Sequence, residues 1–163
     1  KHVKADNIAI WGDSFSNLNG PDTNFRVPRR IDGRPHDVEP LGGLLALLTA
    51  LYDDDISAVY IHRGLAEFRG ALESPFVYVP LDSVIPGLLN HADIPDLAAA
   101  LAPLPLRLDS MVDAYNRRLS SEGANQVFKM ASQQYQNATA ADHFNVATDD
   151  TPSAWLIQQL TDK

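Results

Sequence analysis

A serine directly follows a short apolar run near the start of the sequence, in the segment Gly12-Asp13-Ser14. The run Ile8–Trp11 is typical of a buried strand, and we expect that strand over Asn7–Trp11. In open α/β sheets, sites lie at the carboxyl ends of strands. Several hydrolase folds present a nucleophilic serine on a sharp turn at such a strand end. Ser14 is therefore the first candidate nucleophile.

Alternating strand and helix patterns indicate the elements that must position this serine. We expect strands over Asn7–Trp11, Ile56–Ile61, Pro75–Pro80 and Asn125–Met130, and helices over Val38–Tyr52, Leu81–Asn90, Ile94–Leu101, Leu106–Ser120 and Pro152–Leu160. Thr151 is expected to cap the last helix, with Pro152 at its first position. The alternation predicts a single domain over residues 1–163 with a three-layer α/β/α, flavodoxin-like architecture and a mostly parallel sheet of about five strands.

The segment Phe15–His36 is rich in Asn, Gly, Pro and Arg and predicts a long loop. Loops of this length are usually functional or disordered. The basic cluster of the chain, Arg26, Arg29, Arg30 and Arg34, lies in this segment and is interpreted as a solvated loop rather than an anion site.

Composition excludes several classes of function. The chain has no cysteine, so disulfides, iron–sulfur clusters and thiolate zinc sites are impossible. The five histidines are scattered without ligand spacing, and no Walker loop or dinucleotide fingerprint is present, so neither a metal nor another cofactor is expected. Thirteen basic against 21 acidic residues give a net charge of −8, which disfavours nucleic acid as a partner.

No apolar run approaches the roughly 18 residues of a membrane span. The first residues, Lys1–Asp6, lack the apolar segment of a secretory signal. We therefore expect a soluble protein without a membrane span, either intracellular or a mature secreted form. The compartment and the oligomeric state stay open.

The order of several motifs resembles the GDSL-type esterases and lipases of the SGNH hydrolase superfamily. Gly12–Asn17 resembles the first block of that family, and Asn19-Gly20, Arg30–Arg34 and a leucine-rich helix follow in the family order. Later resemblances are Val59–Phe68 to the strand that ends in Gly-x-Asn-Asp, Tyr115–Leu119 to the late Asn-x-x-Leu helix, and Thr148–Ala154 to the closing Asp-x-x-His-Pro block. The resemblance spans nearly the whole chain, and its first block is close.

The resemblance implies roles for particular residues. Ser14 matches the nucleophile, and the backbone N–H groups of Ser14 and Gly33 match the oxyanion donors. Fixed donors of this kind contribute a few kcal/mol each to transition-state stabilisation. The implied activity is hydrolysis of small acyl or acetyl esters through a Ser14 acyl-enzyme.

Three positions depart from the family pattern. Ala66 stands in place of the asparagine donor, Thr148 in place of the acid, and Thr151 in place of the base. A threonine hydroxyl can neither accept the serine proton near neutral pH nor stabilise an imidazolium.

Substitutes for the base and the acid can be sought nearby. His143 is the first candidate base, with Asp149 and Asp150 as carboxylates that could orient it. His62 is a second candidate base, because it directly follows a predicted strand.

Asn17 or Asn19 could supply the missing amide donor, although nothing in the sequence positions either of them. Two hypotheses follow from the whole pattern. The first is a carboxylic ester hydrolase. The second is a non-catalytic or strongly divergent chain, natural or artificial, that keeps the fold and binds a glycan or a partner.

Overall fold

The chain forms a parallel α/β sheet, here seen in a computed structural model that describes residues 7–26 and 33–161. Across these residues the sheet has four strands: β1 (Ile8–Asp13), β2 (Ile56–His62), β3 (Leu106–Asp109) and β4 (Phe144–Ala147). Their order in space is β1-β2-β3-β4, and all neighbouring strands are parallel.

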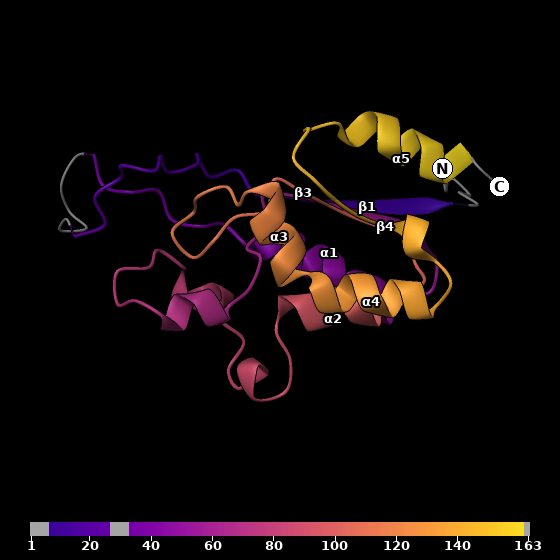
Figure 1. Cartoon of the computed structure of the whole chain (residues 1–163), viewed down its shortest axis with the longest axis horizontal. Coiled ribbons are helices and arrows are strands. Elements are labelled where there is room, and N and C mark those ends of the chain that lie inside the picture. Colours follow the sequence, from indigo (N-terminus) through magenta and orange to yellow (C-terminus); the bar gives the residue numbers. More distant parts are fainter. Residues whose placement is uncertain (1–6, 27–32, 162–163) are drawn as a thin grey trace, which may run out of the picture.

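Helices cover both faces of this sheet (Figure 1). The helices are α1 (Leu41–Tyr52), α2 (Ile94–Ala100), α3 (Ser121–Val127), α4 (Lys129–Asn137) and α5 (Pro152–Thr161). The first four lie below the sheet in Figure 1, and α5 lies above it. Because successive crossovers are right-handed and the sheet grows in one direction, the connecting helices must share one face. The expected three-layer, flavodoxin-like α/β/α architecture is confirmed.

The two faces of the sheet differ in chemistry because side chains alternate along each strand. Val59 and Ile61 of β2 belong to one continuous aliphatic core with Leu106 and Leu108 of β3, and this core packs against α1, α2 and α4. On the other face, Tyr60 meets the ring of Trp155 from α5, with 6.0 Å between ring centroids. Charged residues occupy the carboxyl ends of the strands on this second face.

A pair of glycines allows α1 to approach the end of β1. A Cβ added at Gly12 would overlap the carbonyl of Gly42, and one added at Gly42 would overlap the backbone of Asp13. The first turn of α1 therefore lies directly against the strand end that carries Ser14.

Residues 14–26 run out from the sheet and residues 33–40 run back to it, to the left in Figure 1, and we call these two stretches the arm. Two buried asparagines brace it. The Asn19 amide donates to the carbonyl oxygens of His36 and Tyr115, both at 2.8 Å, and its Oδ1 accepts from the His36 N–H at 2.9 Å. Asn116 Nδ2 donates to the Asn17 carbonyl at 2.8 Å. These hydrogen bonds join the arm to residues 115–116. The Asn19 side chain is used in these contacts and not at the end of β1.

Several expected elements are different in the structure. The described residues hold four strands rather than five, and Pro75–Pro80 is an irregular segment. Leu81–Asn90 holds two short 3₁₀ turns, Leu81–Ser83 and Leu88–Asn90, instead of a helix. The expected strand Asn125–Met130 is helical, because Ser120 caps α3 by accepting a hydrogen bond from the Gly123 N–H.

The expected helix Leu106–Ser120 is the largest difference. It is the strand β3 followed by a loop. Ser110 and Asn116 have φ values of 53° and 55°, which a right-handed helix cannot contain. The Asp113 carboxylate accepts hydrogen bonds from the Tyr115 and Arg117 N–H groups and so stabilises a turn. Of the predicted basic cluster, Arg29 and Arg30 lie outside the described residues.

Candidate active site at the carboxyl edge of the sheet

Polar side chains from all four strand ends meet at the carboxyl edge of the sheet. Asp13, His62 and Asp109 end β1, β2 and β3 and are paired in the sheet register. We call this group and its immediate neighbours the edge cluster, which consists of Asp13, Ser14, His62, Asp109, Ser110, Arg118 and Asp150. This edge is where parallel α/β sheets bind ligands.

His62 lies between two carboxylates. Its Nδ1 is 2.9 Å from Asp13 Oδ1, and its Nε2 is 3.1 Å from Asp150 Oδ1. A carboxylate only accepts hydrogen bonds, so the ring must carry both protons to donate to both oxygens. The side chain of His62 is 15% exposed, which leaves its ring largely shielded from water.

Asp109 is a fully buried carboxylate with several donors. The Tyr60 hydroxyl donates to its Oδ2 at 2.9 Å, and an Arg107 Nη2 lies 3.5 Å from the same oxygen. The Ser110 hydroxyl lies 3.0 Å from Asp109 Oδ1. Burial, and secondly the hydrogen bond to Asp109, raise the pKa of Tyr60 far above its usual value. The phenol is therefore a permanent donor at this position.

Asp150 bridges the cluster from the loop after β4. Its Oδ1 accepts from the Ser110 hydroxyl at 2.6 Å, and its Oδ2 lies 3.3 Å from an Arg118 Nη2. These donors, led by the Ser110 hydroxyl and opposed by partial burial, lower the pKa of Asp150 below its usual range. Asp150 is therefore ionised at neutral pH.

Asp149 and Thr151 flank Asp150 and are both bound to Arg107. An Arg107 Nη2 pairs with Asp149 Oδ1 and donates to the Thr151 hydroxyl at 3.2 Å. The hydrogen bond from Arg107, followed by one from Thr151, lowers the pKa of Asp149. The two expected orienting carboxylates thus have different partners: Asp150 meets His62, whereas Asp149 meets an arginine.

Ser14 directly follows β1 and lies at the same edge as His62. Its residue is 4% exposed, and its backbone N–H donates to the His62 carbonyl oxygen at 3.1 Å. This amide, an expected oxyanion donor, is therefore engaged in the sheet. Within the described residues, no histidine nitrogen forms a hydrogen bond with the Ser14 hydroxyl.

His143 lies at the opposite edge of the sheet. It ends a 3₁₀ turn immediately before β4, and its Nδ1 is 2.7 Å from the carbonyl oxygen of Pro103, which precedes β3. In a parallel sheet, residues before the strands and residues after them lie at opposite ends. The structure therefore brings His62, and not His143, to the edge that carries Ser14.

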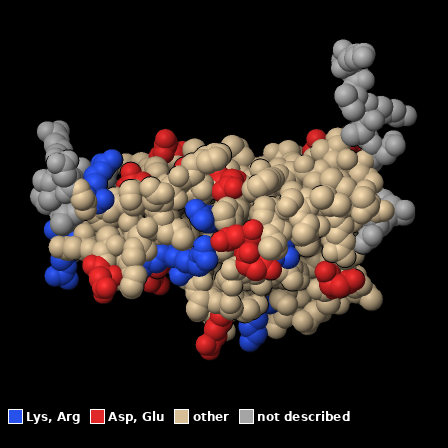
Figure 2. All heavy atoms as spheres, turned by 90° about the horizontal axis from the view of Figure 1, so that it is seen from above, with Lys and Arg blue, Asp and Glu red and all other residues tan. Residues whose placement is uncertain are grey.

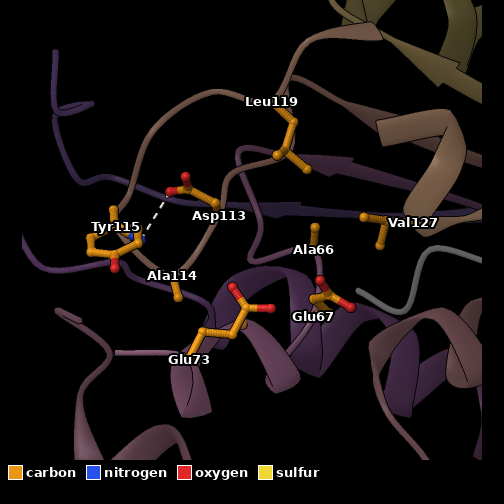
Figure 3. Close-up of a pocket in the computed structure, with 9 residues that line it drawn as sticks. Ala66, Glu67, Glu73, Asp113, Ala114, Tyr115, Leu119 and Val127 are labelled. Atoms are coloured by element: carbon orange, nitrogen blue, oxygen red, sulfur yellow. Dashed lines mark hydrogen bonds between the residues drawn. The ribbon is translucent and has the colours of Figure 1, made fainter. Parts of the chain in front are cut away.

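Two further positions taken from the family pattern have surroundings of a different kind. Gly33 is exposed, has a φ of 76°, and a Cβ added there would meet no atom within 4 Å. Ala66 lines a small pocket of about 110 Å³ together with Glu67 and Asp113 (Figure 3). Burial, and secondly the charge of Asp93, raise the pKa of Glu67. None of the edge-cluster residues lines this pocket.

Sequence reasoning missed much of the edge cluster. Asp109 and Ser110 were expected inside a helix, so the strand end that they form was not foreseen. The signal that could have located them is the short run Leu106–Asp109, in which apolar and charged residues alternate before Ser110. Arg118 reaches Asp150 across 32 positions of sequence, and no local pattern indicates such a contact.

Residues 7–26 and 33–161 hold no group of three or more metal-ligating side chains placed to hold an ion. Their helices are all too short or too polar to cross a membrane. On the face shown in Figure 2, basic and acidic side chains are mixed toward the end that carries the arm, without a continuous basic surface.

The chain is a parallel α/β protein in which Ser, His and Asp side chains gather at the carboxyl edge of the sheet. Comparisons with protein-family models, with curated proteins and with solved structures each gave no match.

Proposed function

We propose that the protein is a carboxylic ester hydrolase that acts on small acyl or acetyl esters at the edge cluster. Ser14 is the nucleophile in this proposal, His62 is the general base, and Asp13 orients the imidazole. The observation that carries it is the 2.9 Å contact between Asp13 Oδ1 and His62 Nδ1, beside the serine that follows Asp13. A carboxylate on one ring nitrogen fixes the orientation of a histidine whose other nitrogen handles the proton.

The reaction follows from these roles. His62 Nε2 takes the Ser14 proton while the hydroxyl oxygen attacks the ester carbonyl, and the alcohol leaves with that proton. Water, deprotonated by the same nitrogen, then releases the acid and restores Ser14. Because Nε2 now donates to Asp150, the base becomes available only when the Asp150 carboxylate leaves it and the Nε2 proton passes to water.

A serine-directed probe tests the proposal. We expect a fluorophosphonate to label Ser14, and the hydrolysis of p-nitrophenyl acetate to fall by orders of magnitude in Ser14→Ala and His62→Ala, because these groups act as a unit. His143→Ala is the matched control, since His143 lies at the other edge of the sheet. Labelling of Ser110 instead would move the nucleophile to β3. No labelling, or equal hydrolysis by all variants, would reject the proposal.

A second candidate function is a non-catalytic binding protein with the same fold. It is favoured by one specific observation: both ring nitrogens of His62 contact carboxylates, and within the described residues the Ser14 hydroxyl forms no hydrogen bond with a histidine. This candidate predicts no covalent labelling and no ester turnover, with the fold intact by circular dichroism.

A further inference from the structure

We propose that the edge cluster contains a receptor for a small carboxylate anion, and that the side chain of Asp150 occupies this receptor as an internal ligand. The receptor consists of Ser110, His62 and Arg118. Its ligand class is a monocarboxylate of the size of acetate, because the part of Asp150 beyond Cα is a methylene carrying one carboxylate.

Donors from β2 and from the loop after β3 converge on Asp150. The Ser110 hydroxyl and His62 Nε2 lie 2.6 Å and 3.1 Å from Oδ1, and Arg118 Nη2 lies 3.3 Å from Oδ2. Both carboxylate oxygens therefore have partners, and two of the donors carry or can carry positive charge. Charge-assisted hydrogen bonds of this kind are about twice as strong as neutral ones.

The Ser110 and His62 donors of the receptor are largely buried, whereas the Arg118 side chain is 36% exposed and the ligand is not buried. Ser110 is 0% exposed and the His62 side chain 15% exposed, whereas the Asp150 side chain is 41% exposed. Asp150 thus covers the donors from the solvent side. Removal of its carboxylate would leave His62 Nε2 without this acceptor, and the Ser110 hydroxyl with only the more distant Asp109 Oδ1, at 3.0 Å. A largely buried donor that has lost its acceptor favours an oxygen that replaces it.

Asp150 is also attached in a way that permits exchange. Its neighbours Asp149 and Thr151 are bound to Arg107, so the chain on both sides has its own anchor. The backbone of Asp150 itself contributes one long hydrogen bond, 3.4 Å from its N–H to Asp109 Oδ1, and has a φ of 52°. A left-handed φ is strained for a residue other than glycine. This strain lowers the free-energy cost of moving Asp150 out of the receptor.

The groups behind the receptor restrict the ligand further. Asp13 lies against His62 Nδ1, and Asp109 lies within 3.0 Å of the Ser110 hydroxyl. These two carboxylates repel added negative charge, so the receptor suits a monoanion better than a dianion such as phosphate. The proposal does not require ester hydrolysis, although the acid released by an esterase belongs to the same ligand class.

Acetate binding to Asp150→Gly tests this proposal. Glycine removes the internal ligand and suits the positive φ. We expect sodium acetate, compared with sodium chloride at equal ionic strength, to raise the Tm of this variant saturably. It should also shift the His62 ring signals in NMR spectra, at concentrations at least tenfold below those needed for the wild type. Asp149→Gly is the matched control, because Asp149 contacts Arg107 and Thr151 instead, and it should behave like the wild type.

Two results would overturn the proposal: the absence of a saturable acetate effect in Asp150→Gly, or an equal effect in all three proteins. If Asp150→Gly fails to fold, Asp150→Asn decides, since it keeps the shape but loses the charge that pairs with Arg118. Acetate should then shift the His62 signals at lower concentration than in the wild type, and equal titrations would reject the receptor. Acetate binding without esterase activity would reject only the proposed function, and the reverse result would reject only the receptor.

Discussion

His62 is held by residues that lie far from it in the sequence, Asp13 at 49 positions before it and Asp150 at 88 positions after it. The sequence pattern indicates a histidine after an apolar run. The two carboxylates come next to this histidine only when the chain folds and the strands pair. The same holds for Ser110, whose hydroxyl meets Asp150 across 40 positions. The register of the strands therefore decides which side chains meet at the site. A local sequence pattern does not reveal that register.

Replacement of His62 should weaken the fold as well as any chemistry. In His62→Ala, the Asp13 and Asp150 carboxylates each lose a donor, and a partly buried group that loses its partner costs about 1–3 kcal/mol. We expect the free energy of unfolding in urea to fall by about that amount. His143→Ala, an exposed histidine at the opposite edge, should change it by less than about 0.5 kcal/mol. Equal losses in the two variants would contradict the geometry of the edge cluster.

Among the helices and strands, those with long sequence patterns were predicted correctly more often than those with short ones. Strands β1 and β2 and helices α1, α2 and α5 were predicted to within a few residues. Both β3 and β4 have four residues, too few for alternation to compete with a longer helical stripe. The stripe through Leu108, Met111 and Tyr115 favours a helix, but the turn around Asp113 overrides it. This mistaken element concealed the strand end at Asp109 and Ser110, which are two of the seven residues of the edge cluster.

The junction of α1 with β1 should tolerate no added side chain. In Gly42→Ala, the methyl group would overlap the backbone of Asp13, and neither the strand nor the helix can yield without loss of packing. Overpacking of this kind costs about 1–3 kcal/mol. Urea denaturation should show this loss, together with displaced NMR signals of Asp13 and Ser14. Gly20→Ala is the control, because its nearest neighbour, the Thr23 hydroxyl, is 3.9 Å away.

The arm should depend on the Asn19 side chain. Asn19→Ala leaves the His36 N–H and the carbonyl oxygens of His36 and Tyr115 without this partner, so the arm should open more often. We expect limited proteolysis within residues 15–36 to become several times faster, while the thermal transition of the sheet moves little. Asn24→Ala, which removes one exposed local hydrogen bond to the Arg26 N–H, should leave the cleavage rate near the wild-type value. Equal rates in the two variants would show that Asn19 does not brace the arm.

At the scale of the whole molecule, the order β1-β2-β3-β4 is that of a flavodoxin-like 2-1-3-4-5 sheet without its outer strand. The link from β1 to β2 carries the arm and one helix, where the longer order requires a helix, a strand and a second helix. β1 is thus an edge strand, and Ser14 lies at the border of the sheet rather than at its centre. His62 and Arg118 connect this side of the sheet to the loop after β4 through Asp150. The whole molecule carries a net charge of −8.

This arrangement predicts how stability depends on pH. The pKa values of Asp149 and Asp150 are lowered in the folded protein, whereas in the unfolded chain they return to the ordinary value of about 3.8. The folded state therefore binds fewer protons, and these carboxylates stabilise it fully above pH values near 5. Their contribution declines as the pH falls below about 4, through their lowered folded-state pKa values. The Asp150 carboxylate contacts His62 and Arg118, so its protonation weakens these two contacts together.

Urea denaturation of the wild type and of Asp149→Asn/Asp150→Asn at several pH values measures this contribution, because the difference between them cancels the titration of distant groups. We expect the double variant to be less stable by a constant amount between pH 7 and pH 5. The two proteins should then converge as the pH falls from about 4 to 3, where protonation removes from the wild type the charges that the variant already lacks. A difference that stays constant down to pH 3 would show that these carboxylates are not linked to folding, and that the loop after β4 is held to the sheet by other contacts.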